Sequence, residues 1–229
     1  MALILSIETS TTFCSVALHQ GGLLVAKRES LTAQSTASQL AVLIDEMMKS
    51  TTRSPRDLQA VAVSAGPGSY TGLRIGVATA KGICYALSIP LISINTLELL
   101  VRQFLASQTI AQTALCCPML DARRMEVYCL LANRQKEVVE KTQAKVIDAY
   151  SFANRLATQE IYFFGDGAAK CKDAIQHPNA HFIDGLHPFA EHMGAWAFEQ
   201  FQAKEIEDTA LFEPFYLKDF MIRKPIAVN

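Results

Sequence analysis

A glycine-rich loop at residues 66–72 is the first feature of the sequence that could do chemistry. It reads GPGSYTG and joins an expected buried strand at 60–65 to an expected helix at 71–87. Such a junction presents free backbone N–H groups that can bind an anion. The loop lacks a following Lys-Ser or Lys-Thr, and Thr71 stands at the third glycine position of a dinucleotide fingerprint. We therefore favour a tight turn rather than a phosphate site. In this turn, Ser69 or Thr71 caps the helix.

The histidines do not follow a metal-binding pattern. His187 and His192 are five residues apart, whereas the H-E-x-x-H and H-x-x-E-H patterns place two histidines four apart. His177 and His181 are four apart, but Pro178 between them disfavours a shared helical face. The sequence also lacks G-x-S-x-G, so spacing nominates neither a metal site nor a nucleophile.

A second polar turn, Asp121-Ala122-Arg123-Arg124, lies between expected strands at 116–121 and 125–131. Arg123 or Arg124 could reach a phosphate or a carboxylate. A solvated turn with a local ion pair is the interpretation that we favour.

Composition indicates a folded chain with a partner. The 229 residues are 50% hydrophobic and 19% charged, against a usual charged share of about 25%. A chain of this length can bury a sizeable core, and some apolar surface is expected to meet another protein. The six cysteines show no CxxC pair, which predicts reduced, buried thiols.

The net charge of -1 gives no overall attraction to phosphate backbones. No basic cluster is longer than a pair such as Arg123-Arg124 or Arg223-Lys224, so weak binding to nucleic acid is expected for the chain alone. The apolar run at residues 1–7 has no basic start and ends at Glu8. We therefore expect a soluble cytoplasmic protein without a signal peptide or a membrane span.

The expected elements follow one order twice. The first half has strands at 2–8, 13–19, 22–29, 60–65 and 91–95, with helices at 38–49, 71–87 and from 96. The second has strands at 116–121, 125–131, 137–142, 161–165 and 180–183, with helices at 151–158, 168–175 and 188–204. The sequence predicts an α/β protein with two similar βββαβαβα halves, 1–105 and 106–229, which face each other across a cleft.

Four stretches resemble the TsaB (YeaZ) family: residues 4–18 (ILSIETSTTFCSVAL), 63–90 (VSAGPGSYTGLRIGVATAKGICYALSIP), 121–128 (DARRMEVY) and 214–219 (PFYLKD). The resemblance implies the fold of actin, Hsp70 and sugar kinases (ASKHA). It implies a non-catalytic part in making threonylcarbamoyladenosine next to the anticodon of ANN-decoding tRNAs. The partner would be TsaD, which holds the metal and transfers the threonylcarbamoyl group, with TsaE as the ATPase component and tRNA bound only through the complex.

Differences between this sequence and TsaD-like proteins agree with a non-catalytic role for this chain. TsaD-like proteins place an HxxxH metal pair on a first-half helix, and residues 33–48 here contain no histidine. We therefore expect no metal and no cofactor in this chain. The first-half turn, Glu8-Thr9-Ser10-Thr11, resembles the phosphate turn of the superfamily, whereas the second-half turn carries long side chains. Productive ATP hydrolysis is not expected, and the candidate residues of a weak nucleotide or anion cleft are Thr9, Ser10, Thr11, Gly66, Gly68 and Ser69.

Two first-half helices are expected to form the partner surface. Helix 38–49 carries an apolar stripe, and helix 71–87 has two rows of small residues, Gly72–Gly76–Ala80 and Ala78–Gly82–Ala86. Side by side they could form a four-helix interface with TsaD, or with a second copy when the chain is alone. The expected contact residues are Leu40, Leu43, Ile44, Met47, Arg74, Ile75, Ala78 and Gly82. Burial of these residues inside the chain is the competing account.

Two other classes of function stay open. An ATP-dependent small-molecule kinase would need two suitable phosphate turns and a catalytic carboxylate, and ATP turnover by the chain alone would favour it. A glycoprotease-like peptidase would need a metal or a nucleophile, and stoichiometric metal in the purified protein would favour that class.

Overall fold

The computed structural model describes residues 1–31 and 36–217. The last two residues of the PFYLKD stretch and the Arg223-Lys224 pair lie outside this description. All six cysteines lie in the described part and are buried, as expected. No helix of the described ranges is both long and apolar enough to cross a membrane.

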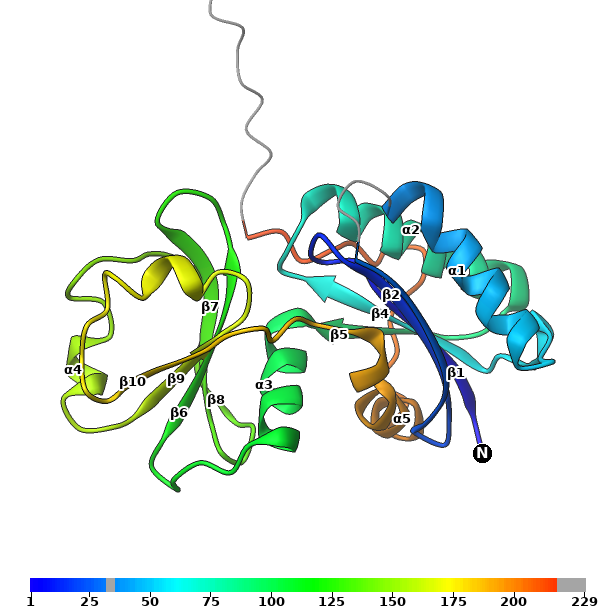
Figure 1. Ribbon diagram of the computed structural model, residues 1–229. Helices are drawn as coiled ribbons and strands as arrows, with labels where there is room; N and C mark the ends of the chain where they lie inside the picture. Colours follow the sequence, from blue (N-terminus) through cyan, green and yellow to red (C-terminus); the bar gives the residue numbers. More distant parts are fainter. Residues whose placement is uncertain (32–35, 218–229) are drawn as a thin grey trace, which may run out of the picture.

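The first half contains a five-stranded sheet with the order β3-β2-β1-β4-β5 (Figure 1). Its strands are β1 (Leu3–Glu8), β2 (Cys14–Gln20), β3 (Leu23–Ser30), β4 (Ala60–Gly66) and β5 (Leu91–Asn95). The helices are α1 (Thr36–Ser50), α2 (Tyr70–Leu87) and α3 (Thr96–Ser107), with a 3-10 turn at Pro55–Asp57. β1 pairs antiparallel with β2 and parallel with β4.

The second half repeats the sheet order as β8-β7-β6-β9-β10. Its strands are β6 (Leu115–Asp121), β7 (Glu126–Asn133), β8 (Val138–Val146), β9 (Ile161–Phe164) and β10 (Ala180–Ile183). The helices are α4 (Ala153–Leu156) and α5 (Gly194–Ala203). The predicted α/β class with two similar halves is confirmed by this repetition.

All three second-half helices differ from the prediction. The helix expected at 151–158 is reduced to the four residues of α4. The segment expected as a helix at 168–175 forms a 3-10 turn at Ala169–Cys171, although Ala168, Cys171 and Ile175 are buried in the second-half core, because a helix this short is marginal by itself. The helix expected at 188–204 is divided into a 3-10 turn, Ala190–His192, and α5. α5 starts at Gly194, where an added Cβ would collide with the ring of His19.

The helices cover both faces of the first sheet. Leu3, Leu5 and Ile7 of β1 pack in one core cluster with α1 and α2, whereas Ala2 and Ile4 join a second cluster with α5. This alternation follows from the strand period of two. Figure 1 shows α1 and α2 side by side, with α5 across the sheet from them.

Each half contributes a helix to the packing of the other. α3 follows the first sheet but packs much of its apolar face against β6 and β7, and α5 returns from the second half to the first sheet. The predicted division at residue 105 stays a prediction.

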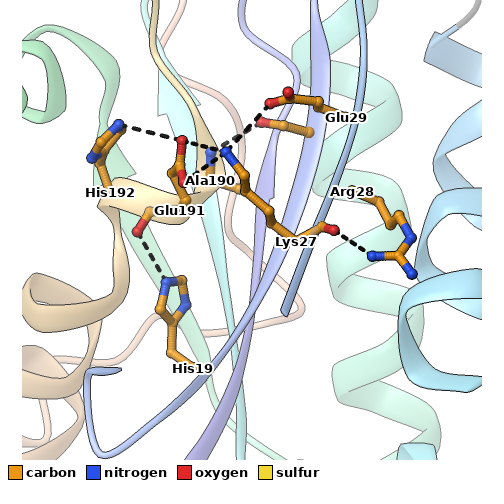
Figure 2. A network of polar contacts seen from close by, with 8 residues as sticks. His19, Lys27, Arg28, Glu29, Ala190, Glu191 and His192 are labelled. Atoms are coloured by element: carbon orange, nitrogen blue, oxygen red, sulfur yellow. Dashed lines mark hydrogen bonds and ion pairs between the residues drawn. The ribbon is translucent and has the colours of Figure 1, made fainter. Parts of the chain in front are cut away.

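Polar contacts hold the returning segment to the first sheet (Figure 2). Lys27 pairs with Glu191 at 2.9 Å, and His19 Nε2 lies 3.1 Å from the carbonyl oxygen of Glu191. His19 Nδ1 lies 3.0 Å from Ser6 Oγ. Burial lowers the pKa of His19, which favours the neutral ring between these two partners. The segment at 190–192 is therefore fixed by polar contacts to β2 and β3.

Candidate functional site

The glycine-rich loop lies directly on the first-half turn. The Ser69 N–H donates to the Ser10 carbonyl at 2.6 Å. A Cβ added to Gly68 or Gly72 would stand well under 3.0 Å from a carbonyl oxygen of Ser10 or Thr9. Only glycine allows this approach of the loop and α2 to the turn.

This packing covers the first-half turn, which supplies three of the residues of the candidate nucleotide or anion site. Thr9, Ser10, Thr11 and Gly66 are buried, Gly68 is half-buried, and Ser69 is exposed. The structure thus brings the six predicted residues together, but the loop itself covers the turn. Ser69 caps α2, because its Oγ accepts from the Gly72 N–H at 3.3 Å.

Glu8 is buried at the start of this turn. Its Oε1 accepts from the Ser10 N–H at 2.6 Å, and its Oε2 has no hydrogen-bond partner among the described residues. Burial raises the pKa of the Glu8 carboxyl to about 7, although hydrogen bonds from Ser10 oppose the rise. The sequence placed Glu8 in this turn but did not predict its burial or its raised pKa, since burial at a strand end cannot be read from residue spacing.

Glu8→Gln should change how stability depends on pH. The folded pKa of about 7 lies above the reference value of 4.5, so the stabilising contribution of the neutral carboxyl is complete below about pH 4.5 and is lost as pH rises through about 7. Such a shift corresponds to roughly 3 kcal/mol. We expect the amide variant to exceed wild type in free energy of unfolding above pH 7 and to approach it at low pH.

Urea unfolding across this pH range measures the effect. Glu46→Gln, on the exposed side of α1, is the control and should leave the pH profile unchanged. Parallel profiles for wild type and Glu8→Gln would contradict the buried, neutral carboxyl.

The second-half turn forms a local ion pair. The Lys170 ammonium pairs with the Asp121 carboxylate and donates to the Glu126 carbonyl at 2.7 Å. Arg123 and Arg124 are exposed, with left-handed φ values of 72° and 51°. The predicted solvated turn is therefore correct, but lysine rather than arginine supplies the cation.

The predicted partner surface is only partly exposed. Leu40, Leu43 and Met47 are buried in the first-half core, so the competing account, burial inside the chain, holds for these three. The physical reason is that α1 turns this stripe toward β2 and β3. Ile44 and Ile75 are half-buried, whereas Arg74, Ala78 and Gly82 are exposed on α2. Contact of any of these residues with a partner stays a prediction.

α2 separates its two rows of small residues. Gly72, Gly76 and Ala80 are buried, and an added Cβ at Gly72 or Gly76 would overlap Thr9. The row of Ala78, Gly82 and Ala86 is exposed, and an added Cβ at Gly82 would meet nothing within 4 Å. One side of the helix thus closes the turn, and the other faces outward.

A C-terminal strap, residues 205–217, runs over α2 and was missed by sequence reasoning. The Glu207 N–H donates to the Leu91 carbonyl at 2.9 Å, and the Phe215 N–H donates to the Ala65 carbonyl at 2.7 Å. Between them, Lys81 Nζ donates to the carbonyls of Ala210 and Phe212 at 3.1 and 2.9 Å. The available signal was Lys81, one of only two charged residues on α2. The strap and α2 line an open hollow of about 600 Å³.

Comparisons with known proteins agree with this architecture. The model of the family described as TsaD, tRNA N6-adenosine threonylcarbamoyltransferase, matches residues 30–224. The tRNA threonylcarbamoyladenosine biosynthesis protein TsaB of Escherichia coli is 29% identical over 94% of both chains. That of Bacillus subtilis is 30% identical over 60% of this chain and 58% of its own length. The solved structure of YeaZ from Pseudomonas aeruginosa is 25% identical, with a TM-score of 0.78 over 95% of this chain and 100% of its own.

The two sheets of identical order, joined by crossing helices, define an α/β protein of the actin, Hsp70 and sugar-kinase (ASKHA) class. The chain belongs to the family described as TsaD, tRNA N6-adenosine threonylcarbamoyltransferase. Its predicted resemblance to the TsaB (YeaZ) proteins within this class is confirmed.

Proposed function

We propose that this chain is a non-catalytic cytoplasmic subunit in the formation of threonylcarbamoyladenosine on tRNA, and that it binds and supports a TsaD-type transferase. The observation that supports this most is the contrast between the two sides of α2. The inner side and the glycine-rich loop cover the turn at Thr9 and Ser10, whereas the outer side presents Ala78 and Gly82. A chain with its phosphate turn covered and a helix face exposed is suited to binding a partner.

The proposed complex forms through the exposed side of α2. The relatives from Escherichia coli and Bacillus subtilis carry the name of the tRNA modification pathway, which supports the assignment to that pathway. In the proposed complex, the outer side of α2 meets the transferase, TsaE with ATP is the third component, and tRNA binds through the assembled complex. Without the transferase, a second copy of this chain docks at the same face and forms a homodimer.

Omitting single components tests this proposal. A mixture of this chain, the matching TsaD and TsaE, threonylcarbamoyl-adenylate, ATP and tRNA should form the modified nucleoside. Leaving out either this chain or TsaD should reduce product to background, because one supports and the other transfers. Mass spectrometry of digested tRNA measures the product, and adding the missing protein back is the control.

Three results would contradict the proposal. Modification by this chain without TsaD would show that it is catalytic. Sustained ATP turnover by the purified chain would favour the kinase-like alternative, and stoichiometric metal with peptide cleavage would favour the peptidase.

A further inference from the structure

The hollow between α2 and the C-terminal strap has an excess of positive charge. Arg74 and Lys81 are the only charged residues of α2, and both line the hollow. Glu213 of the strap is the one acidic residue in the lining, so two cations stand against one carboxylate. The rest of the wall is apolar or aromatic and includes Val77, Ala78 and Tyr216.

The two cations differ in what they already bind. Lys81 Nζ donates to two strap carbonyls, so its position is set by the chain itself. Arg74 is exposed, and its Nη1 donates to the Tyr70 hydroxyl at 2.9 Å. Within the part of the chain that the structure describes, no carboxylate oxygen lies within 4.0 Å of the Arg74 guanidinium.

Aromatic side chains hold the Arg74 guanidinium over the hollow. Its central carbon lies 5.4 Å from the centroid of the Tyr70 ring, and that ring lies 4.9 Å from the ring of Tyr216. A guanidinium steadied on an aromatic face keeps most of its N–H donors for a second partner. The planar donor pair of arginine matches the two oxygens of a carboxylate.

The exposed small residues indicate what carries this carboxylate. Ala78 and Gly82 follow Arg74 at intervals of four residues and therefore share its side of α2. Without large side chains there, another helix can approach closely. A second copy of this chain, which is proposed to dock here when the transferase is absent, brings two further cations against the same excess charge and therefore binds less tightly than an acidic partner. A different, acidic helix fits better.

We propose that the hollow beside Arg74 receives an aspartate or glutamate side chain from a helix of the transferase partner, and that Arg74 pairs with it. This inference rests on the proposed function and adds the chemistry of recognition. It also explains why the strap is anchored by Lys81: the strap forms the second wall of the hollow, with Glu213 and Tyr216.

Titration calorimetry with the matching TsaD-type subunit tests the pairing. Arg74→Glu should weaken the affinity by about 100-fold, because the partner carboxylate would face a like charge. Arg74→Gln should reduce the affinity less than Arg74→Glu does. Arg74→Lys should reduce it least, since a lysine keeps the charge but not the paired donors. Replacing the contacting acidic residue of the partner with arginine should restore binding to Arg74→Glu.

Arg134→Glu is the matched control, because Arg134 is exposed on the hairpin between β7 and β8 and the substitution changes the net charge equally. It should bind as wild type, and circular dichroism should show all variants folded. Equal affinities for Arg74→Glu and wild type would overturn the inference while the proposed function stands. Loss of only the homodimer in Arg74→Glu would identify a second copy as the occupant and overturn it too. Absence of binding by wild type would contradict the proposed function itself.

Discussion

Ala78→Arg is expected to weaken binding to a TsaD-type subunit by about 100-fold and to break the homodimer, while the chain stays folded. Ala78 is exposed near the middle of α2, so a long side chain can extend into solvent in the isolated chain. At a helix–helix contact the same side chain would hold the two backbones apart and bury an unpaired charge. Light scattering, calorimetry and circular dichroism measure assembly, affinity and fold on one sample.

Leu43→Arg is the informative counterpart, because both residues were predicted at the partner surface. Leu43 is buried in the first-half core, so a charge there should destabilise the chain by several kcal/mol and cause unfolding. A folded Ala78→Arg variant that still dimerises and still binds the transferase would place the interface elsewhere. A folded, stable Leu43→Arg variant would contradict the packing of α1 on the sheet.

Gly72→Ala is expected to destabilise the chain by about 3 kcal/mol, although alanine normally favours a helix. The new Cβ would overlap the carbonyl oxygen of Thr9, which belongs to the backbone and cannot turn away as a flexible side chain can. α2 and the turn would have to separate. Urea unfolding monitored by circular dichroism measures the loss.

Gly82→Ala makes the same substitution on the outer side of the same helix. Its Cβ would meet nothing within 4 Å, so we expect a gain in stability of about 0.5–1 kcal/mol from the higher helix propensity of alanine. Equal effects of the two substitutions would contradict the close contact of α2 with Thr9, because helix propensity alone would then explain both.

Local patterns predicted most of the secondary structure. The strands at 60–65 and 91–95 and the helix at 71–87 lie within one residue of β4, β5 and α2. Glycine-rich turns and apolar periodicity are local signals, and they were sufficient here. The helices expected at 151–158, 168–175 and 188–204 were wrong in extent, because short segments take their form from what they pack against.

The candidate site was likewise predicted from the sequence only in part. Sequence by itself identified the glycine-rich loop, the two rows of small residues on one helix and the family resemblance, since all of these depend on residue order. Tertiary structure alone decided which row is covered: Gly72 and Gly76 contact Thr9, which is far away in the sequence, whereas Ala78 and Gly82 face outward. It also decided that Leu43 is buried, that Glu8 has a raised pKa, and that the strap meets α2 at Lys81. Each depends on contacts between distant segments, and helical periodicity states which residues share a face but not what that face meets.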